Sequence, residues 1–206
     1  MNYRVAYRLG FHPWEDLAEH PPFAGALLRL VAREEDGDGP PYGPALDLGC
    51  GSAVWGVRLA ARGWQVTGVD LVERALDRAR DRVAAAGVEL RLVHGDVTAL
   101  RKADVGAGYR LVLDTGTFHG LEPAEREAMG REVDAVCARD ATIVLDCFAP
   151  RRRGPLPRGA DRADVERAFP DWEITDAVCA DTEPDALARL FAFEERFFRL
   201  RRKPAP

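Results

Sequence analysis

From Ala45 onward, short apolar runs typical of β-strands alternate with longer segments of helical periodicity. Such alternation is typical of parallel strands joined by crossover helices, so it predicts an α/β fold. The chain has 206 residues, of which 47% are hydrophobic, enough for one domain with its own core. The seven predicted strands are Ala45–Gly49, Gln65–Asp70, Glu89–Asp96, Tyr109–Gly116, Ala141–Ala149, Trp172–Ala180 and Phe197–Arg202.

The connecting segments predict helices that cover the sheet and loops that separate its parts. Apolar residues recur at three- and four-residue steps over Val72–Ala86, with charged residues on the other face. A similar helix is expected over Glu122–Arg139, where Pro123 suits the first turn. The acidic run Glu34–Pro41 and the Pro/Gly-rich run Pro150–Gly159 predict surface loops.

Composition narrows the possible partners. The net charge of −5 offers no electrostatic attraction for nucleic acid, so that partner is disfavoured. The four cysteines are widely spaced and form no C-x-x-C pair, so we expect reduced, mostly buried thiols and no metal site. Neither a signal peptide nor an apolar run of roughly 20 residues is present, which predicts no membrane association and a cytoplasmic location. We expect a monomer or a homodimer.

A glycine turn follows the first predicted strand. The run Leu46–Ala53 carries Gly49 and Gly51, and a helical pattern begins directly after it, at Val54. Glycines tolerate positive φ and let a ligand approach the backbone, and a helix start offers unpaired amides. A ligand that bears a carboxylate would therefore bind well there.

A carboxylate follows the second predicted strand. Asp70 comes 21 residues after Gly49, so both residues are expected at the carboxyl edge of neighbouring strands, where a carboxylate can accept two ribose hydroxyls. Each feature alone is commonly structural, as a tight turn or a helix cap, but together they favour a nucleotide-like ligand. A dinucleotide is disfavoured because Val54 stands where G-x-G-x-x-G requires its third glycine.

Three segments resemble the class I S-adenosylmethionine-dependent methyltransferases: Leu46–Gly51, Gln65–Asp70 and His94–Val97. The resemblance spans most of the chain and implies a Rossmann-like, mostly parallel sheet of seven strands with helices on both faces, with the order 3-2-1-4-5-7-6 and the last strand antiparallel. It also implies a single domain over residues 1–206, with an amino-terminal lid over 1–40 and a cofactor-binding core over 45–206. One departure is Ala53, where family members often carry glycine, and this leaves the geometry of the turn open.

The same resemblance implies how S-adenosylmethionine would be held. Asp47 and the turn at Gly49–Gly51 would hold the methionine end, Asp70 the ribose, and Asp96 with the amide of Val97 the adenine. The full set of implied cofactor-binding residues is Trp14, Asp47, Gly49, Cys50, Gly51, Asp70, Leu71, Asp96, Val97, Asp114 and Thr115.

Two candidate catalytic residues follow the fourth predicted strand. Asp114 could supply negative potential near the sulfonium of the cofactor. His119 is the candidate general base, because an unperturbed imidazole titrates near neutral pH, with a pKa of about 6.5. The alternative is that His119 only holds its turn by a hydrogen bond. Many methyl transfers need alignment alone, which can supply about 7–11 kcal/mol.

The amino-terminal segment is rich in aromatic residues. The run Pro13-Trp14-Glu15 is similar to one near the start of thiopurine-methyltransferase-like enzymes. In that group the aromatic residue would pack against the cofactor, where an indole face suits a sulfonium. The alternative is a helix that packs Phe11 and Trp14 onto the sheet.

The basic loop after the fifth predicted strand could recognise an anionic acceptor, although a solvated loop is the simpler interpretation. Cys50 and Cys147 are interpreted as packing residues, since neither comes with a cue for an activating base. The arginines of this loop are Arg151, Arg152, Arg153 and Arg158.

Several subclasses of methyltransferase lack their diagnostic residues here. Asp114-Thr115-Gly116 stands where amino-group methylases show an Asn/Asp-Pro-Pro-aromatic run, no Pro-Cys dipeptide is present, and the only asparagine is Asn2. What remains is metal-independent methylation of a heteroatom (S, O, N or halide) in a small molecule. The alternatives are a cofactor-binding protein of the same fold with other chemistry or none, and a nicotinamide-dependent oxidoreductase.

Overall fold

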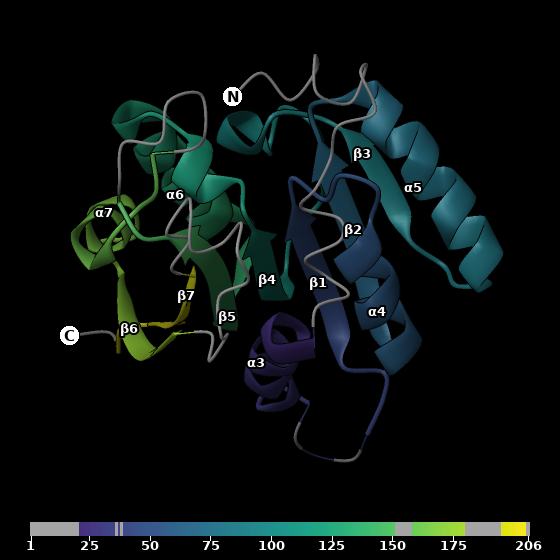
Figure 1. Ribbon diagram of the computed structural model, residues 1–206, viewed down its shortest axis with the longest axis horizontal. Coiled ribbons are helices and arrows are strands. Elements are labelled where there is room, and N and C mark those ends of the chain that lie inside the picture. Colours follow the sequence, from purple (N-terminus) through teal and green to yellow (C-terminus); the bar gives the residue numbers. More distant parts are fainter. Residues whose placement is uncertain (1–20, 36, 38, 151–157, 180–194, 205–206) are drawn as a thin grey trace.

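A seven-stranded sheet forms the centre of the computed structural model, which describes residues 21–35, 37, 39–150, 158–179 and 195–204. The strand order is β3-β2-β1-β4-β5-β7-β6, and β7 runs antiparallel to both of its neighbours. Figure 1 shows the sheet from β3 on the right to β6 on the left. The implied topology is therefore confirmed. The strands are β1 Gly43–Leu48, β2 Trp64–Asp70, β3 Arg91–His94, β4 Tyr109–Thr115, β5 Cys137–Phe148, β6 Trp172–Cys179 and β7 Glu195–Arg202.

Helices connect the strands, and their ends follow from local residues. Gly63 and Gly87 take left-handed conformations that end α4 and α5, as glycine commonly does after a helix. Pro123 occupies the first turn of α6, as predicted. The helices are α3 Pro21–Ala32, α4 Val54–Arg62, α5 Glu73–Ala86, α6 Pro123–Val136 and α7 Arg162–Ala168, with short 3₁₀ turns η1 Val97–Ala99 and η2 Phe118–Gly120.

Two apolar clusters form the core. In the first, β-strand residues pack with Met129 and Val133 of α6 and Val165 of α7. In the second, Phe23 of α3 and Trp55 of α4 pack against other strand residues. Alternate side chains of a strand point to opposite faces, and α4 also contacts α5. The sheet is thus covered on both faces, as predicted.

Several predicted boundaries differ from those of the structure, and two helices were not predicted. The helix expected to reach Arg139 ends at Val136, and β5 begins at Cys137, because Cys137 pairs with Tyr109 of β4. The pairing then shifts, so that Leu111 pairs with Thr142. Tertiary pairing thus overrides the helical pattern of these residues. The third strand is shorter than expected and covers only Arg91–His94, while α3 and α7 are additional.

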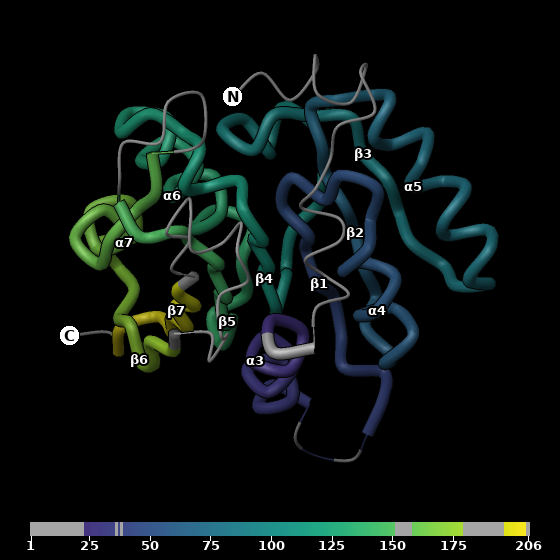
Figure 2. The backbone as a smooth tube through the Cα atoms, viewed as in Figure 1, coloured from purple at the N-terminus to yellow at the C-terminus, as the bar shows by residue number. Residues whose placement is uncertain are grey.

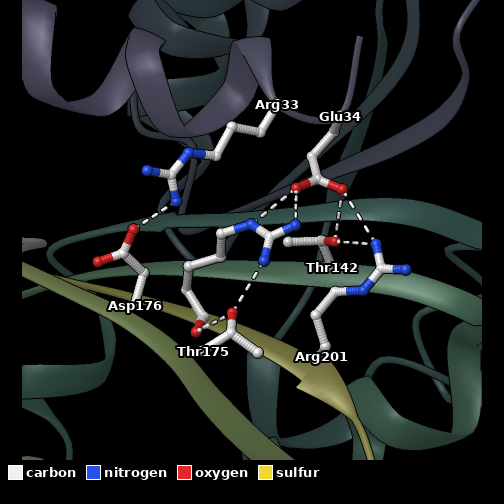
Figure 3. A network of polar contacts seen from close by, with 7 residues as sticks. Arg33, Glu34, Thr142, Thr175, Asp176 and Arg201 are labelled. Atoms are coloured by element: carbon white, nitrogen blue, oxygen red, sulfur yellow. Dashed lines mark hydrogen bonds and ion pairs between the residues drawn. The ribbon is translucent and has the colours of Figure 1, made fainter. Parts of the chain in front are cut away.

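An ionic network joins the end of α3 to the sheet (Figure 3). Glu34 accepts hydrogen bonds from Arg199 Nε at 2.8 Å, from Arg201 Nη1 at 3.2 Å and from the hydroxyl of Thr142 at 2.6 Å. Arg33, beside it, pairs with Asp176 of β6. Thr142 lies in the first half of β5, so the network is remote from the carboxyl ends of the parallel strands.

The carboxyl ends of the parallel strands all lie at one edge of the sheet. β1 and β2 run upward in Figure 2, so their ends lie at the upper edge, whereas α3 lies near the lower end of β1. Within the described part of the chain, no helix is both long and apolar enough to cross a membrane. The amino-terminal lid predicted over residues 1–40 falls mostly outside the described residues.

Candidate functional site

The glycine turn after β1 has an unusual backbone. Gly49, Gly51 and Ala53 have φ values of 61°, 55° and 58°, so every second residue is left-handed. The amide of Cys50 donates to Val69 O at 3.0 Å, and the amide of Ala53 donates to Cys50 O at 2.8 Å. Glycine adopts this conformation freely, but alanine does so only under strain. The departure at Ala53 therefore keeps the geometry that a glycine would allow.

Gly49 also brings the turns after β1 and β4 into contact. A Cβ atom at Gly49 would lie 1.9 Å from Thr117 Oγ1, which itself donates to Leu48 O at 3.3 Å. No side chain fits in that space. Glycine at this position thus serves the packing of two turns as well as the positive φ.

Asp70 joins the end of β2 to the glycine turn. Its carboxylate accepts the amide of Gly51 at 2.9 Å and the amide of Val72 at 2.8 Å. Burial raises the pKa of this carboxyl, and the two backbone amides and the nearby His94 oppose that rise. The glycine turn and Asp70 were predicted to meet at the carboxyl edge of neighbouring strands, and in the structure Gly51 makes the contact.

Asp47 is a buried carboxylate whose needs the described residues do not meet. Its side chain is 1% exposed, and neither oxygen has a hydrogen-bond partner among the described residues. Burial raises the pKa of Asp47 to about 8; the charges of Asp114 and Asp70 add to the rise and the nearby amide of Gly56 opposes it. A buried carboxylate without a partner is costly, so its presence points to a cationic ligand.

The helix after the turn approaches Asp47 through a glycine. A Cβ atom at Gly56 of α4 would lie 3.1 Å from Asp47 Oδ2 and 2.7 Å from Leu90 Cδ1. Gly56 thus has a packing role beside the carboxylate. The lack of a side chain here leaves room for α4 to close over the end of β1.

Asp114, a predicted cofactor-binding and catalytic residue, is fully buried at the end of β4. Its carboxylate accepts the amides of Gly116 at 2.9 Å, Thr117 at 2.8 Å and Phe118 at 3.0 Å. Burial raises its pKa to about 7, and these three amides oppose the rise. The geometry makes Asp114 the organiser of the turn that presents Thr115 and Thr117 at the sheet edge.

His119, the candidate base, lies in η2 and is 3% exposed. Its Nδ1 atom accepts the amide of Phe148 at 3.2 Å, and its ring stacks on that of Phe148 with centroids 4.5 Å apart. An amide can donate to Nδ1 only when that nitrogen carries no proton, which leaves the proton of the neutral ring on Nε2. The ring therefore links the turns after β4 and β5.

The segment predicted to read an adenine lies at the ends of β2 and β3. Asp70 pairs with His94 in the sheet, and His94 Nε2 lies 3.0 Å from Leu71 O. Asp96 caps η1 by accepting the amide of Thr98 at 2.8 Å. Among the described residues, Leu71 is the one large hydrophobic side chain that is exposed, at 45%. An apolar platform thus lies beside the ribose-binding candidate.

Cys50, Cys137 and Cys147 are free thiols, and Cys50 and Cys147 are buried. Burial raises the pKa of both thiols, and the neighbouring aspartates add to the effect. A raised pKa makes a thiol a poor nucleophile at neutral pH, which agrees with the predicted packing role. Cys50 also packs against Gly68, where a Cβ atom would lie 2.9 Å from its sulfur.

Some predicted residues cannot be placed and others were missed. Trp14 and the arginines at 151–153 lie outside the described residues, while the exposed Arg158 pairs with Glu122 at 3.0 Å.

The residue most clearly missed by the sequence analysis is Arg126 of α6, which is 6% exposed. It donates to Phe118 O at 3.1 Å, to His119 O at 3.2 Å and to Gly159 O at 2.7 Å. A signal was present in the sequence: Arg126 precedes Met129 by three residues and Val133 by seven, a spacing that places it on the buried face of α6.

The described residues also include no group of three potential metal ligands. What the edge of the sheet does present is a strained turn, an acceptor at Asp70, an unsatisfied carboxylate at Asp47 and an exposed leucine. This set suits a ligand that has a cationic group, hydroxyls and an apolar ring.

Comparisons with known proteins show similarity to methyltransferases. A family model described as a methyltransferase domain matches residues 45–140. Thiopurine S-methyltransferase of Pseudomonas fluorescens is 28% identical over 172 residues, which are 74% of this chain and 78% of the relative. Ribosomal RNA small subunit methyltransferase C of Alcanivorax borkumensis is 40% identical over 73 residues, which are 35% of this chain and only 22% of that protein.

The fold of this chain is similar to that of a solved structure. The 1,6-didemethyltoxoflavin-N1-methyltransferase of Burkholderia thailandensis, solved with 1,6-didemethyltoxoflavin and S-adenosylhomocysteine, superposes with a TM-score of 0.72 at 21% identity. The match covers 98% of this chain and 86% of that one. At this level of identity, the likeness concerns the fold.

Proposed function

We propose, from the premise that this chain is a class I S-adenosylmethionine-dependent methyltransferase, that it methylates a heteroatom of a small molecule. S-adenosylmethionine is its cofactor. We also propose which residues hold this cofactor and which kind of molecule the chain methylates. The observation that carries the proposal is the buried carboxylate of Asp47, which lies at the glycine turn without a partner among the described residues.

The cofactor has a cationic ammonium group at its methionine end, and Asp47 is the group to receive it. The pKa of this carboxyl is raised to about 8 chiefly by burial. A bound ammonium would restore the ionised form, because an opposite charge at close range favours the carboxylate. The left-handed turn at Gly49–Gly51 would let the methionine end approach the backbone, with Cys50 packed behind it.

The rest of the cofactor would lie along the ends of β2 and β3. Each oxygen of Asp70 accepts one backbone amide, and a carboxylate has further lone pairs with which to accept ribose hydroxyls. The exposed side chain of Leu71 would pack against the adenine, with Asp96 and the amide of Val97 at its polar edge. Thr115, at the end of β4, would face the sulfonium through its backbone.

When bound, S-adenosylmethionine supplies a methyl group on a good leaving group, so the chain's own contribution is alignment. Asp114 would hold the β4 turn through its three backbone hydrogen bonds. His119 would act as a scaffold, because its Nδ1 lone pair already accepts the amide of Phe148. The candidate role of His119 as a general base is thus the less favoured one.

Two relatives act on small molecules by their names, a thiopurine and 1,6-didemethyltoxoflavin. They support a small-molecule acceptor for this chain, with sulfur, oxygen, nitrogen and halide as the candidate atoms. An aromatic lid around Trp14 and anion recognition by the basic loop at 151–158 remain part of this proposal.

Calorimetry with S-adenosylhomocysteine tests the binding half of the proposal. We expect saturable binding by the full chain and a clear loss of affinity in Asp47→Asn. Asp81→Asn, an exposed aspartate of α5, is the matched control and should bind normally. No binding by the unmodified chain would overturn the proposal.

Incubation with methyl-labelled S-adenosylmethionine and a panel of thiols, halides, phenols and amines tests the reaction. We expect equal amounts of labelled acceptor and S-adenosylhomocysteine with at least one class. Labelled cofactor that binds tightly but yields another product, or none with any class, would favour the alternative of a cofactor-binding protein with different chemistry.

A further inference from the structure

We infer that Arg82, on helix α5, is a positioning residue that holds the glycine turn in its cofactor-binding conformation. This inference rests on the proposed function and adds to it a residue outside the three motif segments. Arg82 belongs to the charged face of a helix that the sequence marks as solvated, so nothing in its pattern indicates a role in the site.

The contacts of Arg82 reach the centre of the turn. Its Nε atom donates to Ser52 O at 3.0 Å, and its Nη2 atom lies 3.4 Å from Ser52 Oγ. Ser52 is 2% exposed and lies between the two left-handed residues Gly51 and Ala53. A guanidinium has several donors in a fixed plane, so it can hold a carbonyl and a hydroxyl of one residue together.

The contact with Ser52 O controls one particular peptide plane. The carbonyl of Ser52 and the amide of Ala53 belong to the same planar unit, whose orientation is set by ψ of Ser52 and φ of Ala53. Arg82 holds the carbonyl end, and Cys50 O holds the amide end at 2.8 Å. With both ends fixed, this peptide cannot rotate, and φ of Ala53 stays at 58°.

The need for this hold arises from Ala53. A non-glycine residue in the left-handed region persists only where its surroundings over-determine it. Without the guanidinium, rotation of this peptide would let Ala53 relax to negative φ and would carry the turn away from the geometry set by Gly49 and Gly51. With glycine at position 53, the same conformation would need no support.

The experiment is a double-variant cycle read by calorimetry with S-adenosylhomocysteine. Arg82→Ala is expected to weaken binding by about tenfold, which corresponds to about 1.4 kcal/mol. Arg80→Ala is the matched control, because Arg80 lies on the same helix, carries the same charge and pairs only within that helix, with Glu73 and Asp77, in the described contacts. It should bind as the unmodified chain does.

The second variant is Ala53→Gly, which should restore most of the affinity when added to Arg82→Ala and change little by itself. This rescue separates the hold on Ser52 from any other contact of the guanidinium. Normal binding by Arg82→Ala, or an equal loss in the single and the double variant, would overturn the inference. Failure of the unmodified chain to bind would instead overturn the proposed function.

Discussion

At the scale of single residues, the carboxylate of Asp47 sets stability against function. The residue is buried without a hydrogen-bond partner among the described residues, and its pKa is raised to about 8. The folded chain therefore binds its proton more tightly than the unfolded chain does. By linkage, this group favours the folded state at low pH, and that contribution is lost as pH rises from about 4 to 8.

Asp47→Asn should consequently stabilise the cofactor-free protein most at high pH. The free energy of unfolding of the variant, minus that of the unmodified chain, should rise by about 2 kcal/mol between pH 6 and 8, since one pKa unit is worth about 1.4 kcal/mol and Asp47 stays mostly protonated over this range in the folded chain. Urea unfolding at several pH values measures this difference. A difference that does not change with pH would contradict the assignment. Asp114 titrates in the same pH range and interacts with Asp47, so the difference also contains the change that the substitution makes to the titration of Asp114.

His119 offers a second test at the same scale. The Oδ1 atom of asparagine can take the place of Nδ1 as acceptor for the amide of Phe148, so His119→Asn should preserve the link between the two turns. We expect its rate of methyl transfer to stay within about tenfold of normal, short of the roughly 10²–10⁴-fold loss typical of a missing general base. A larger loss, together with a changed pH profile, would restore His119 as the base.

At the scale of elements, glycines decide how closely helices approach their neighbours. Gly130 of α6 lies against the last turn of α7, where a Cβ atom would be 1.8 Å from Ala168 O. Gly25 of α3 has more room, because the nearest atom to such a Cβ is the end of Arg29 at 3.5 Å. Close packing of α6 against α7 thus requires a glycine at position 130, whereas position 25 has room for a Cβ atom.

Gly130→Ala should lower the free energy of unfolding by about 1–3 kcal/mol, because backbone atoms of α7 must move to admit the methyl group. Gly25→Ala should instead raise it by about 0.5–1 kcal/mol, since alanine is the better helix former. Thermal and urea unfolding of both variants checks the pair. Equal effects of the two changes would show that the approach of α6 to α7 is looser than described.

At the scale of the whole molecule, the network around Glu34 lies away from the cofactor edge. It connects the end of α3 with β5 and β7 near the amino-terminal half of β5 (Figure 3). The Glu34 side chain is 9% exposed and that of Arg199 is 15% exposed. Loss of one charge from such a pair leaves the other poorly compensated. Because the network is remote from the cofactor edge, a substitution in it should change the free energy of unfolding and leave cofactor affinity unchanged.

Glu34→Gln is expected to lower the free energy of unfolding by about 1–3 kcal/mol, because the hydrogen bonds to a charged group weaken. Arg33→Ala is the control, and its exposed ion pair should contribute less than about 1 kcal/mol. The affinity for S-adenosylhomocysteine should stay unchanged in both variants. A loss of affinity that accompanies the loss of stability would show that the two ends of the sheet are coupled.

Much of the fold was predictable, because the periodicity of apolar residues and the positions of turn residues indicate where strands and helices lie. The strand pattern and the helix over residues 72–86 follow from side-chain spacing, and the strand order follows from the resemblance of three short segments. What spacing could not reveal is the start of β5 at Cys137, because pairing with Tyr109 decides it. The helix α7 is also set by packing, through Val165 and Ala168.

Within the site, the sequence by itself determined which residue types meet at the edge: glycines after β1, a carboxylate after β2 and the acidic residue of β1. The tertiary structure decided what each one does there. It leaves Asp47 without a partner, turns Asp114 toward its own backbone, and brings Arg82 and Arg126 from helices to hold the turns. The reason is physical: hydrogen-bond satisfaction and burial depend on residues far apart in the chain, which local patterns do not encode.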